Sequence, residues 1–332
     1  VKSDGYGLGA IPVSRRLWSE GARSFFVARV AEGEALRQGL GRREATIYVL
    51  DGFPPGVGER LVASDLTPAL STLPQVSAAR AFATARGEPM KVALHIDSGM
   101  NRYGLTPDQA RAVADEPNGL ASLQLDLVMS HLGSSPEAGH PRNALQLDRF
   151  NAARARFEGA RASFANSGGI FLGPQFCFDL VRPGISLYGG GPEERPDSRL
   201  RAVARLEAPI LDIRTIAPGE HLGYGSNLIV EQTTRAAVVA AGYTDGVIRA
   251  AKQRAYAWYA GKRRKLLIVT MDLILVELGQ DAAAIGDWVE LLGPNAHLDE
   301  LATAADTVAH EVLVRLSARA DRIYLGEAPP EG

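Results

Sequence analysis

A lysine followed by a glycine-rich turn is the first place in the chain where the residue types could support covalent chemistry. The segment VKSDGYGLG (1–9) places Lys2 just before a turn that contains Tyr6. Taken alone, such a lysine is more often a surface or salt-bridge residue. A lysine that carries a cofactor needs two further groups, a phosphate anchor and a partner for the cofactor ring. The glycines do not form a dinucleotide-binding fingerprint, because the strand–helix spacing and the later acidic residue are not evident.

Candidate phosphate anchors lie in two short segments further along the chain. The segment NSGG (166–169) offers the Ser167 hydroxyl and backbone N–H groups that glycine leaves accessible. The segment RPGI (182–185) follows it, and Tyr6 can donate its phenol to the same anion. A phosphate site is therefore a reasonable expectation if the fold brings these segments to one place.

Two arginines add fixed positive charge to the same set. Either Arg102 or Arg182 alone would be interpreted as a rim residue that pairs with acids. Together with Lys2 and the candidate anchors, they suit an anionic cofactor and a substrate that carries a carboxylate.

The elements that must position these residues alternate through the first two-thirds of the chain. Short runs rich in Val, Ile and Leu predict parallel strands buried on both faces, and the segments between them predict helices. Thr106-Pro-Asp-Gln109 has the capping-box pattern of a helix N-terminus. A second helix is predicted over 141–158. With the opening VK counted as the end of a first strand, the remaining strands are expected at 24–29, 46–52, 66–71, 92–99, 125–131, 163–167 and 180–185.

About eight such strands predict a (β/α)8 TIM-type barrel. A doubly wound open sheet is the alternative on the strand pattern alone. The barrel explains why the unusual residues follow predicted strands, because barrel enzymes carry their chemistry at the C-terminal strand ends. The residues at these ends are Lys2, Asp97, His131, Ser167 and Arg182.

The pattern changes from about residue 204. LDIRTI (211–216) alternates apolar and polar residues, and further apolar runs follow with Pro-Gly, Gly-Asp and Gly-Pro turns between them. We therefore predict a barrel domain over 1–204 and a mostly-β domain over 205–332. The further runs are 236–242, 266–278, 287–293 and 310–316.

Charge and cysteine content exclude several classes of protein. The 36 Lys and Arg residues against 38 Asp and Glu residues give a formal net charge of −2, which offers no electrostatic case for a nucleic acid or a membrane surface as partner. The basic run 262–265 is interpreted as a solvated strand end or hairpin. The apolar run 266–278 is too short to span a bilayer. The single cysteine, Cys177, excludes an internal disulfide and fits a reducing compartment, so we expect a cytoplasmic protein.

Several segments together resemble the motifs of the alanine racemase family. VKSDGYGLG resembles the lysine motif, HIDSGMNRYGL the Asp-Thr-Gly-Met-x-Arg segment, and DLVRPGISLYG the arginine segment. SHLGSS, FANSGG, LGYGSN, AGYTDG and TMDLILVEL follow in the family's order. The resemblance spans essentially the whole chain. It implies a pyridoxal-phosphate-dependent racemase that interconverts L- and D-alanine, supplies D-alanine for cell-wall peptidoglycan, works as a head-to-tail homodimer and needs no metal ion.

The resemblance also assigns cofactor-binding positions. Lys2 matches the lysine that carries pyridoxal 5'-phosphate, and Arg182 matches the arginine that faces the ring nitrogen. A guanidinium stays protonated and cannot leave that nitrogen cationic as an aspartate would, which favours return of the proton over transamination. His131 matches the hydrogen-bonded chain that leads from the tyrosine base toward Arg182. The phosphate-binding positions of the family are matched by Tyr6, Ser167, Gly184 and Ile185.

The second catalytic base of the family is matched by Tyr224 in LGYGSN. A free phenol has a pKa of about 10, so its ionisation near neutral pH needs roughly 4 kcal/mol from its surroundings. Inversion at Cα requires acid–base groups on both faces, and the resemblance gives Lys2 the D-enantiomer and Tyr224 the L-enantiomer. The substrate positions are matched by Arg102, Tyr243, Met271 and Asp272.

The chain departs from the family pattern at a few positions. His95 stands where many relatives carry a carbamylated lysine that supports the arginine, which leaves open how Arg102 is held. Ala318 stands where some relatives have a tyrosine. Relatives also begin before the lysine with most of the first strand and a helix, so we expect that part of the barrel to be missing from this sequence. The alternatives are a broad-specificity or serine racemase, a non-catalytic pyridoxal-phosphate carrier and an inactive truncated protein.

Overall fold

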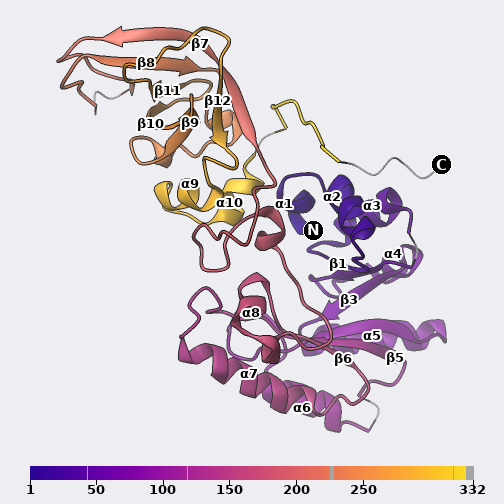
Figure 1. Cartoon of the computed structure of the whole chain (residues 1–332). Helices are drawn as coiled ribbons and strands as arrows, with labels where there is room; N and C mark the ends of the chain where they lie inside the picture. Colours follow the sequence, from indigo (N-terminus) through magenta and orange to yellow (C-terminus); the bar gives the residue numbers. More distant parts are fainter. Residues whose placement is uncertain (43, 118, 225–227, 317, 327–332) are drawn as a thin grey trace. The chain divides into compact units, whose positions relative to one another are not determined.

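The computed structural model describes residues 1–42, 44–117, 119–224, 228–316 and 318–326. It divides into two compact units (Figure 1). The first contains Val1–Gly184 and the end of the chain from Tyr324, and the second contains Ile185–Ile323. Among the described residues, no helix has both the length and the apolar character needed to cross a membrane.

A six-stranded parallel sheet is the framework of the first unit. Its strands are hydrogen-bonded in their order along the chain. A doubly wound sheet would need a reversal of strand order, so that alternative is wrong. The strands are β1 (Ser24–Val27), β2 (Thr46–Val49), β3 (Leu66–Leu70), β4 (Met90–His95), β5 (Leu123–Met129) and β6 (Arg161–Ser163).

Helices connect successive strands, as the β/α repeat predicts (Figure 1). The capping box is confirmed: Thr106 Oγ1 accepts from the Gln109 N–H at 3.2 Å, and the Gln109 side chain accepts from the Thr106 N–H at 3.0 Å. The predicted helix over 141–158 is confirmed but ends earlier, at Arg154. The helices are α1 (Lys2–Tyr6), α2 (Ala10–Ser19), α3 (Val30–Leu40), α4 (Gly58–Ala63), α5 (Leu73–Arg86), α6 (Pro107–Asp115), α7 (Pro141–Arg154), α8 (Ser167–Leu172) and the 3-10 helix η1 (Pro174–Phe176).

Side chains from both edges of the sheet meet in a common interior. Phe26 of β1 stacks on Tyr48 of β2 with ring centroids 4.5 Å apart. The Arg182 guanidinium, from the segment after β6, lies 5.8 Å from the centre of the Phe26 ring. Leu180 packs in the same buried cluster. The sheet therefore curls around its interior, which confirms the barrel architecture.

A hydrogen-bonded network of three polar side chains also connects strands of this barrel. The Tyr48 phenol on β2 donates to the Asp126 carboxylate on β5. Arg161 at the start of β6 donates to that carboxylate at 2.9 Å and to the phenol oxygen at 2.8 Å. These bonds tie three strands together across the barrel.

The first of the eight predicted strands is not formed. Lys2 begins α1, and the Val1 nitrogen donates to the Phe26 carbonyl at 3.0 Å, beside β1. The prediction that Lys2 ends a strand is therefore wrong for the described residues, although the segment lies next to the sheet edge.

The last predicted strand, over 180–185, is not formed either. The N–H groups of Leu180 and Arg182 donate to carbonyls of 162 and 165, so the segment lies beside β6. A regular ladder is not assigned there, and Pro183 has no N–H to extend one. The strand predicted over 163–167 also lies earlier, at β6, because Asn166 caps α8.

The second unit is built on a closed antiparallel barrel with strand order β10-β11-β8-β7-β12-β9. This confirms a mostly-β second domain. The basic run 262–265 begins β10 and pairs with β9, as a hairpin predicts. The elements are η2 (Ile185–Tyr188), β7 (Leu206–Ile216), β8 (Thr234–Val239), η4 (Tyr243–Asp245), η5 (Arg249–Ala251), β9 (Tyr256–Tyr259), β10 (Lys262–Val269), β11 (Ile274–Glu277), β12 (Trp288–Leu292), α9 (Leu298–Ala304) and α10 (Ala309–Val314).

The apolar run 310–316 is expected from the sequence to form a strand of the mostly-β domain. That prediction is wrong, because most of the run lies in the helix α10. Its buried residues Ala309, Val312 and Leu313 recur at helical spacing. The run of apolar residues is too short for its spacing alone to distinguish a strand, with a period of two, from a helix, with a period of 3.6.

Candidate active site

Lys2 is followed by a short left-handed turn. Ser3, Asp4, Gly5 and Tyr6 have φ angles of 54°, 52°, 63° and 60°. Three of these residues carry side chains, and L-residues adopt this region only at a cost in free energy. The turn must therefore be stabilised by its surroundings.

Glu32 and Asp4 supply that support. One oxygen of the Glu32 carboxylate accepts the Ser3 N–H at 2.9 Å, and the other accepts the N–H groups of Ala28 at 2.7 Å and Arg29 at 3.2 Å. The Asp4 carboxylate accepts the Ala10 N–H at 2.8 Å. Glu32 thus joins the residue after Lys2 to the loop between β1 and α3.

Basic groups gather around the open end of this barrel. Partial burial lowers the pKa of Lys2, the Arg102 guanidinium lowers it further, and Glu32 acts in the opposite sense. Burial also lowers the pKa of His131 well below its ordinary value, with contributions from Arg182 and Arg102. These mutual effects place the groups in one electrostatic environment with a strong excess of positive charge. Such an environment favours an anionic ligand.

Arg182 is held by protein oxygen atoms. Its guanidinium donates to the Ser163 hydroxyl and to the Ser130 carbonyl, and more weakly to the Phe164 carbonyl at 3.5 Å. Burial lowers the pKa of Arg182 to about 10. The side chain is therefore still a cation at neutral pH.

Tyr6, Ser167 and Gly184 form a small cradle beside these cations. The Ser167 hydroxyl accepts the Gly184 N–H at 2.8 Å, and Asn166 accepts the Gly169 N–H at 2.9 Å. A Cβ atom at Gly184 would lie 2.2 Å from the Tyr6 phenol oxygen. Only glycine at 184 allows this approach. Burial raises the pKa of Tyr6, so the phenol keeps its proton and can donate it.

His95 is buried and neutral. Its Nδ1 lies 3.2 Å from the Ser71 hydroxyl, and its ring meets the edge of Tyr103 at 6.2 Å between centroids. Burial, Arg182 and Arg102 lower its pKa to about 4. The buried Nε2 has no hydrogen-bond partner among the described residues. The residue beside Arg102 is therefore an uncharged ring, which gives the guanidinium no counter-charge.

These residues fit pyridoxal phosphate. The cradle offers the Ser167 hydroxyl and the protonated Tyr6 phenol, which are donors of the kind that a phosphate needs. The pKa of the Lys2 amine is lowered, which favours the neutral form that can bond to the aldehyde carbon of the cofactor. Arg102 is exposed and makes no hydrogen bond or ion pair with the other described residues, so its guanidinium is free for a substrate carboxylate.

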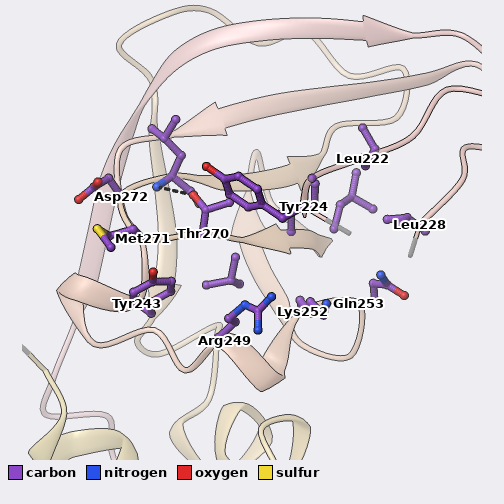
Figure 2. Close-up of a pocket in the computed structure, with 15 residues that line it drawn as sticks. Leu222, Tyr224, Leu228, Tyr243, Arg249, Lys252, Gln253, Thr270, Met271 and Asp272 are labelled. Atoms are coloured by element: carbon purple, nitrogen blue, oxygen red, sulfur yellow. Dashed lines mark hydrogen bonds between the residues drawn. The ribbon is translucent and has the colours of Figure 1, made fainter. Parts of the chain in front are cut away.

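In the second unit, Tyr224 and three further predicted residues line one pocket of about 560 Å³. Tyr224 is 83% exposed at its mouth. Figure 2 shows Tyr224, Tyr243, Met271 and Asp272 around this pocket, with Arg249 and Lys252 in the wall. The residues 225–227 that complete the LGYGSN motif lie outside the described residues. Four of the five predicted residues of the second unit are therefore brought together; the fifth, Ile185, does not line this pocket.

The turn that carries Met271 and Asp272 is tightly anchored. Thr244 donates to the Met271 carbonyl at 2.7 Å, and Arg319 donates to both the Asp272 carboxylate and the Thr244 hydroxyl. A Cβ atom at Gly242 would lie 2.1 Å from the Met271 carbonyl oxygen. Glycine at 242 is thus required for the close approach of these two backbones.

The predicted site residues are divided between the two units. The first unit holds Lys2, Tyr6, Arg102, His131, Ser167, Arg182 and Gly184, and the second holds Ile185, Tyr224, Tyr243, Met271 and Asp272. Ile185 is buried at the start of η2.

The sequence interpretation missed the supporting residues Glu32, Arg142, Gln146 and Arg319. The only available signal was the spacing of Arg142 and Gln146, which lie four residues apart on the predicted helix and so share one of its faces.

Two family models match consecutive parts of the chain. The model described as "Alanine racemase, N-terminal domain" matches residues 1–192, and the model described as "Alanine racemase, C-terminal domain" matches residues 203–324.

Individual relatives are similar over nearly their whole length. The alanine racemase of Rhizobium meliloti (strain 1021) is 40% identical, with 99% of this chain and 90% of that protein covered. The alanine racemase of Rhodospirillum rubrum is 41% identical, covering 98% and 88%. The crystal structure of alanine racemase from Bartonella henselae with covalently bound pyridoxal phosphate superposes with a TM-score of 0.92 at 32% identity, covering 98% of this chain and 91% of that one. The chain belongs to the alanine racemase family.

Proposed function

We propose that the protein is a pyridoxal-phosphate-dependent alanine racemase, an isomerase that interconverts L-alanine and D-alanine. The observation that carries this proposal is the meeting of Lys2, Arg102 and Arg182 with the phosphate cradle at one end of the first barrel. Family membership supports the choice of alanine as substrate.

The proposed cofactor-holding residues are residues of the first unit and Ile185, the next residue along the chain. Lys2 would hold the cofactor covalently until the substrate amine takes its place and frees Nζ; Arg182 and His131 would lie on the side of the ring nitrogen, and Arg102 would bind the substrate carboxylate. When bound, pyridoxal phosphate supplies a conjugated ring that stabilises the negative charge left at Cα after the proton departs. The phosphate is held by Tyr6, Ser167, Gly184 and Ile185.

Two bases act on opposite faces of Cα. Lys2 Nζ accepts the proton from D-alanine, and Tyr224 Oη, as the phenolate, accepts it from L-alanine. The protonated form of the other base then delivers a proton to the opposite face, so the configuration inverts with no net gain or loss of protons. The lowered pKa of Lys2 favours the free amine that this role requires.

The second domain completes the site in the proposed homodimer. Tyr224, Tyr243, Met271 and Asp272 of one subunit reach the cofactor held by the other. Their grouping around one pocket supports a separate second domain, and we propose a cofactor domain over 1–204 and a β domain over 205–332. We further propose a cytoplasmic location, the supply of D-alanine for peptidoglycan as the role, and no nucleic-acid or membrane partner.

The activity can be tested with the purified chain and added pyridoxal phosphate. L-alanine and, in parallel, L-serine are incubated with the protein, and the D-enantiomers are measured with D-amino-acid oxidase. We expect D-alanine to form faster than D-serine, and Lys2→Ala to form neither. Bound cofactor without racemisation would indicate a carrier, and faster turnover of serine would indicate a serine or broad-specificity racemase.

A further inference from the structure

Arg102 owes its position to the backbone that carries it. Its side chain makes no hydrogen bond or ion pair with the other described residues, and the neighbouring His95 is uncharged. The location of the guanidinium therefore depends on how firmly the loop 97–104 is held. This loop leaves the sheet after β4 and returns where the Asp97 N–H donates to the Leu105 carbonyl at 2.8 Å.

Asp97 holds the loop from within. One oxygen of its carboxylate accepts three consecutive N–H groups, from Gly99 at 2.9 Å, Met100 at 2.9 Å and Asn101 at 3.1 Å. Asn101 has a φ angle of 58°, in the left-handed region. The chain therefore reverses immediately before Arg102.

Arg142, at the start of α7, holds the same loop from the other side. Its Nε and Nη2 donate to the Gly99 carbonyl at 3.2 and 2.8 Å, and Nη2 also reaches the Met100 carbonyl at 3.4 Å. The guanidinium lies against Gly133, where a Cβ atom would come within 3.0 Å of its central carbon. The carbonyls of 99 and 100 are thus fixed by a half-buried cation while their N–H groups are fixed by Asp97.

One turn further along α7, Gln146 anchors the helix to the loop 97–104 and to the segment 131–133 that follows β5. Its amide nitrogen donates to the His131 carbonyl at 2.9 Å and to the Ser98 hydroxyl at 3.3 Å, and its oxygen accepts the Gly133 N–H at 2.9 Å. Gln146 is fully buried. Arg142 is therefore held by a rigid helix, so it can transmit a fixed position to the loop.

We infer that Arg142 is a positioning residue for the substrate carboxylate: it acts through the 97–101 backbone to hold Arg102 where the carboxylate binds. This inference rests on the proposed function, which makes Arg102 the carboxylate-binding residue. Arg142 itself does not touch the substrate. Without it, the loop keeps the Asp97 bonds but loses its outer restraint, and Arg102 samples positions that do not bind.

The test uses the cofactor-loaded full-length protein and propionate, which is alanine without its amine. Binding of propionate is measured by calorimetry, and cofactor content and thermal unfolding are measured beside it. We expect Arg142→Ala to weaken propionate binding about 10-fold, with unchanged cofactor content, and the Arg142→Ala/Arg102→Ala double variant to bind no worse than Arg102→Ala. The KM for alanine should rise more than kcat falls. Arg142→Lys should recover part of the affinity, because an ammonium group can bond one carbonyl.

Two further variants separate the outcomes. Gly133→Ala crowds the Arg142 guanidinium without removing it and should weaken propionate binding in the same direction, which keeps the test open if Arg142→Ala folds poorly. Arg156→Ala, which removes a surface ion pair with Asp115, is the matched control. Wild-type propionate affinity in Arg142→Ala together with a loss in Arg102→Ala would overturn the inference and leave the proposed function intact. Wild-type affinity in Arg102→Ala would instead contradict the assignment of Arg102 under the proposed function.

Discussion

The Tyr6 phenol and Gly184 approach so closely that a side chain at 184 has no room. A Cβ atom there would lie 2.2 Å from the phenol oxygen and 3.1 Å from the ring carbon that bears it. Tyr6 belongs to the left-handed turn after Lys2, and Gly184 follows the segment that carries Arg182. The contact therefore joins the first and the last segments of the first barrel along the chain, at the proposed phosphate cradle.

Gly184→Ala should displace the Tyr6 phenol and weaken cofactor binding. Forcing an extra methyl group into a packed site costs about 1–3 kcal/mol, and we expect the Kd for pyridoxal phosphate to rise about 10-fold or more. Fluorescence titration of the apoprotein measures this Kd. Gly139→Ala is the control, because a Cβ atom at 139 meets nothing within 4 Å. Equal Kd values for Gly184→Ala and the wild type would show that the cradle does not hold the cofactor.

Glu32→Gln should loosen the turn after Lys2 and change its acid–base behaviour. In the wild type, the two carboxylate oxygens of Glu32 accept three backbone N–H groups. The glutamine amide has only one acceptor oxygen, so the free energy of unfolding should fall by about 1–3 kcal/mol. Because the Glu32 carboxylate raises the pKa of Lys2, its removal should lower that pKa further. The acid limb of the kcat–pH profile for D-alanine should then move to lower pH.

The comparison variant for Glu32 is Glu34→Gln, on the same helix α3, which removes a surface ion pair with Arg60 of α4. Its profile should follow the wild type. A shift of the acid limb toward higher pH in Glu32→Gln would contradict the assigned electrostatic effect.

Much of this site could be predicted from the sequence because its residues lie in short contiguous motifs. The positions of Lys2, Arg102 and Arg182 followed from local segments, and so did the capping box at Thr106. Local segments could not predict the clamp on the 97–101 loop, because Arg142 meets Gly99 across 43 residues of chain.

The strand predictions failed where local pattern and tertiary context disagree. The segment 180–185 lies beside β6 but is interrupted by Pro183 and held by isolated backbone bonds. The left-handed turn at Ser3 and Asp4 could not be predicted either, since Ser rarely adopts positive φ and Asp does so as a single residue and not within a run. It exists because Glu32, distant in sequence, accepts the Ser3 N–H.

His95 predicts a pH-dependent stability. Its pKa is about 4 in the folded protein, below the ordinary value of 6.5. Between these values the unfolded chain binds the additional proton, so the free energy of unfolding should fall as the pH decreases from 6.5 toward 4. His95→Asn removes this titration. Urea unfolding between pH 4.5 and about 7 should give a shallower dependence on pH for His95→Asn, with a remainder from His131, whose pKa is also lowered.

The exposed His221 provides the control for this measurement. His221→Asn should keep the slope of the wild type. An unchanged slope in His95→Asn would mean that the ring is not buried as a neutral group.

The most direct test of the two-base account is exchange of the α-proton in deuterium oxide. With Tyr224→Phe, exchange from L-alanine should fall by roughly 10²-fold or more, while exchange from D-alanine, which Lys2 initiates, should fall much less. Parallel incubations that start from L-alanine and from D-alanine, followed at early times by chiral separation and mass spectrometry, measure the two rates. Equal loss of exchange from the two enantiomers would contradict the assignment of Lys2 and Tyr224 to opposite faces of Cα.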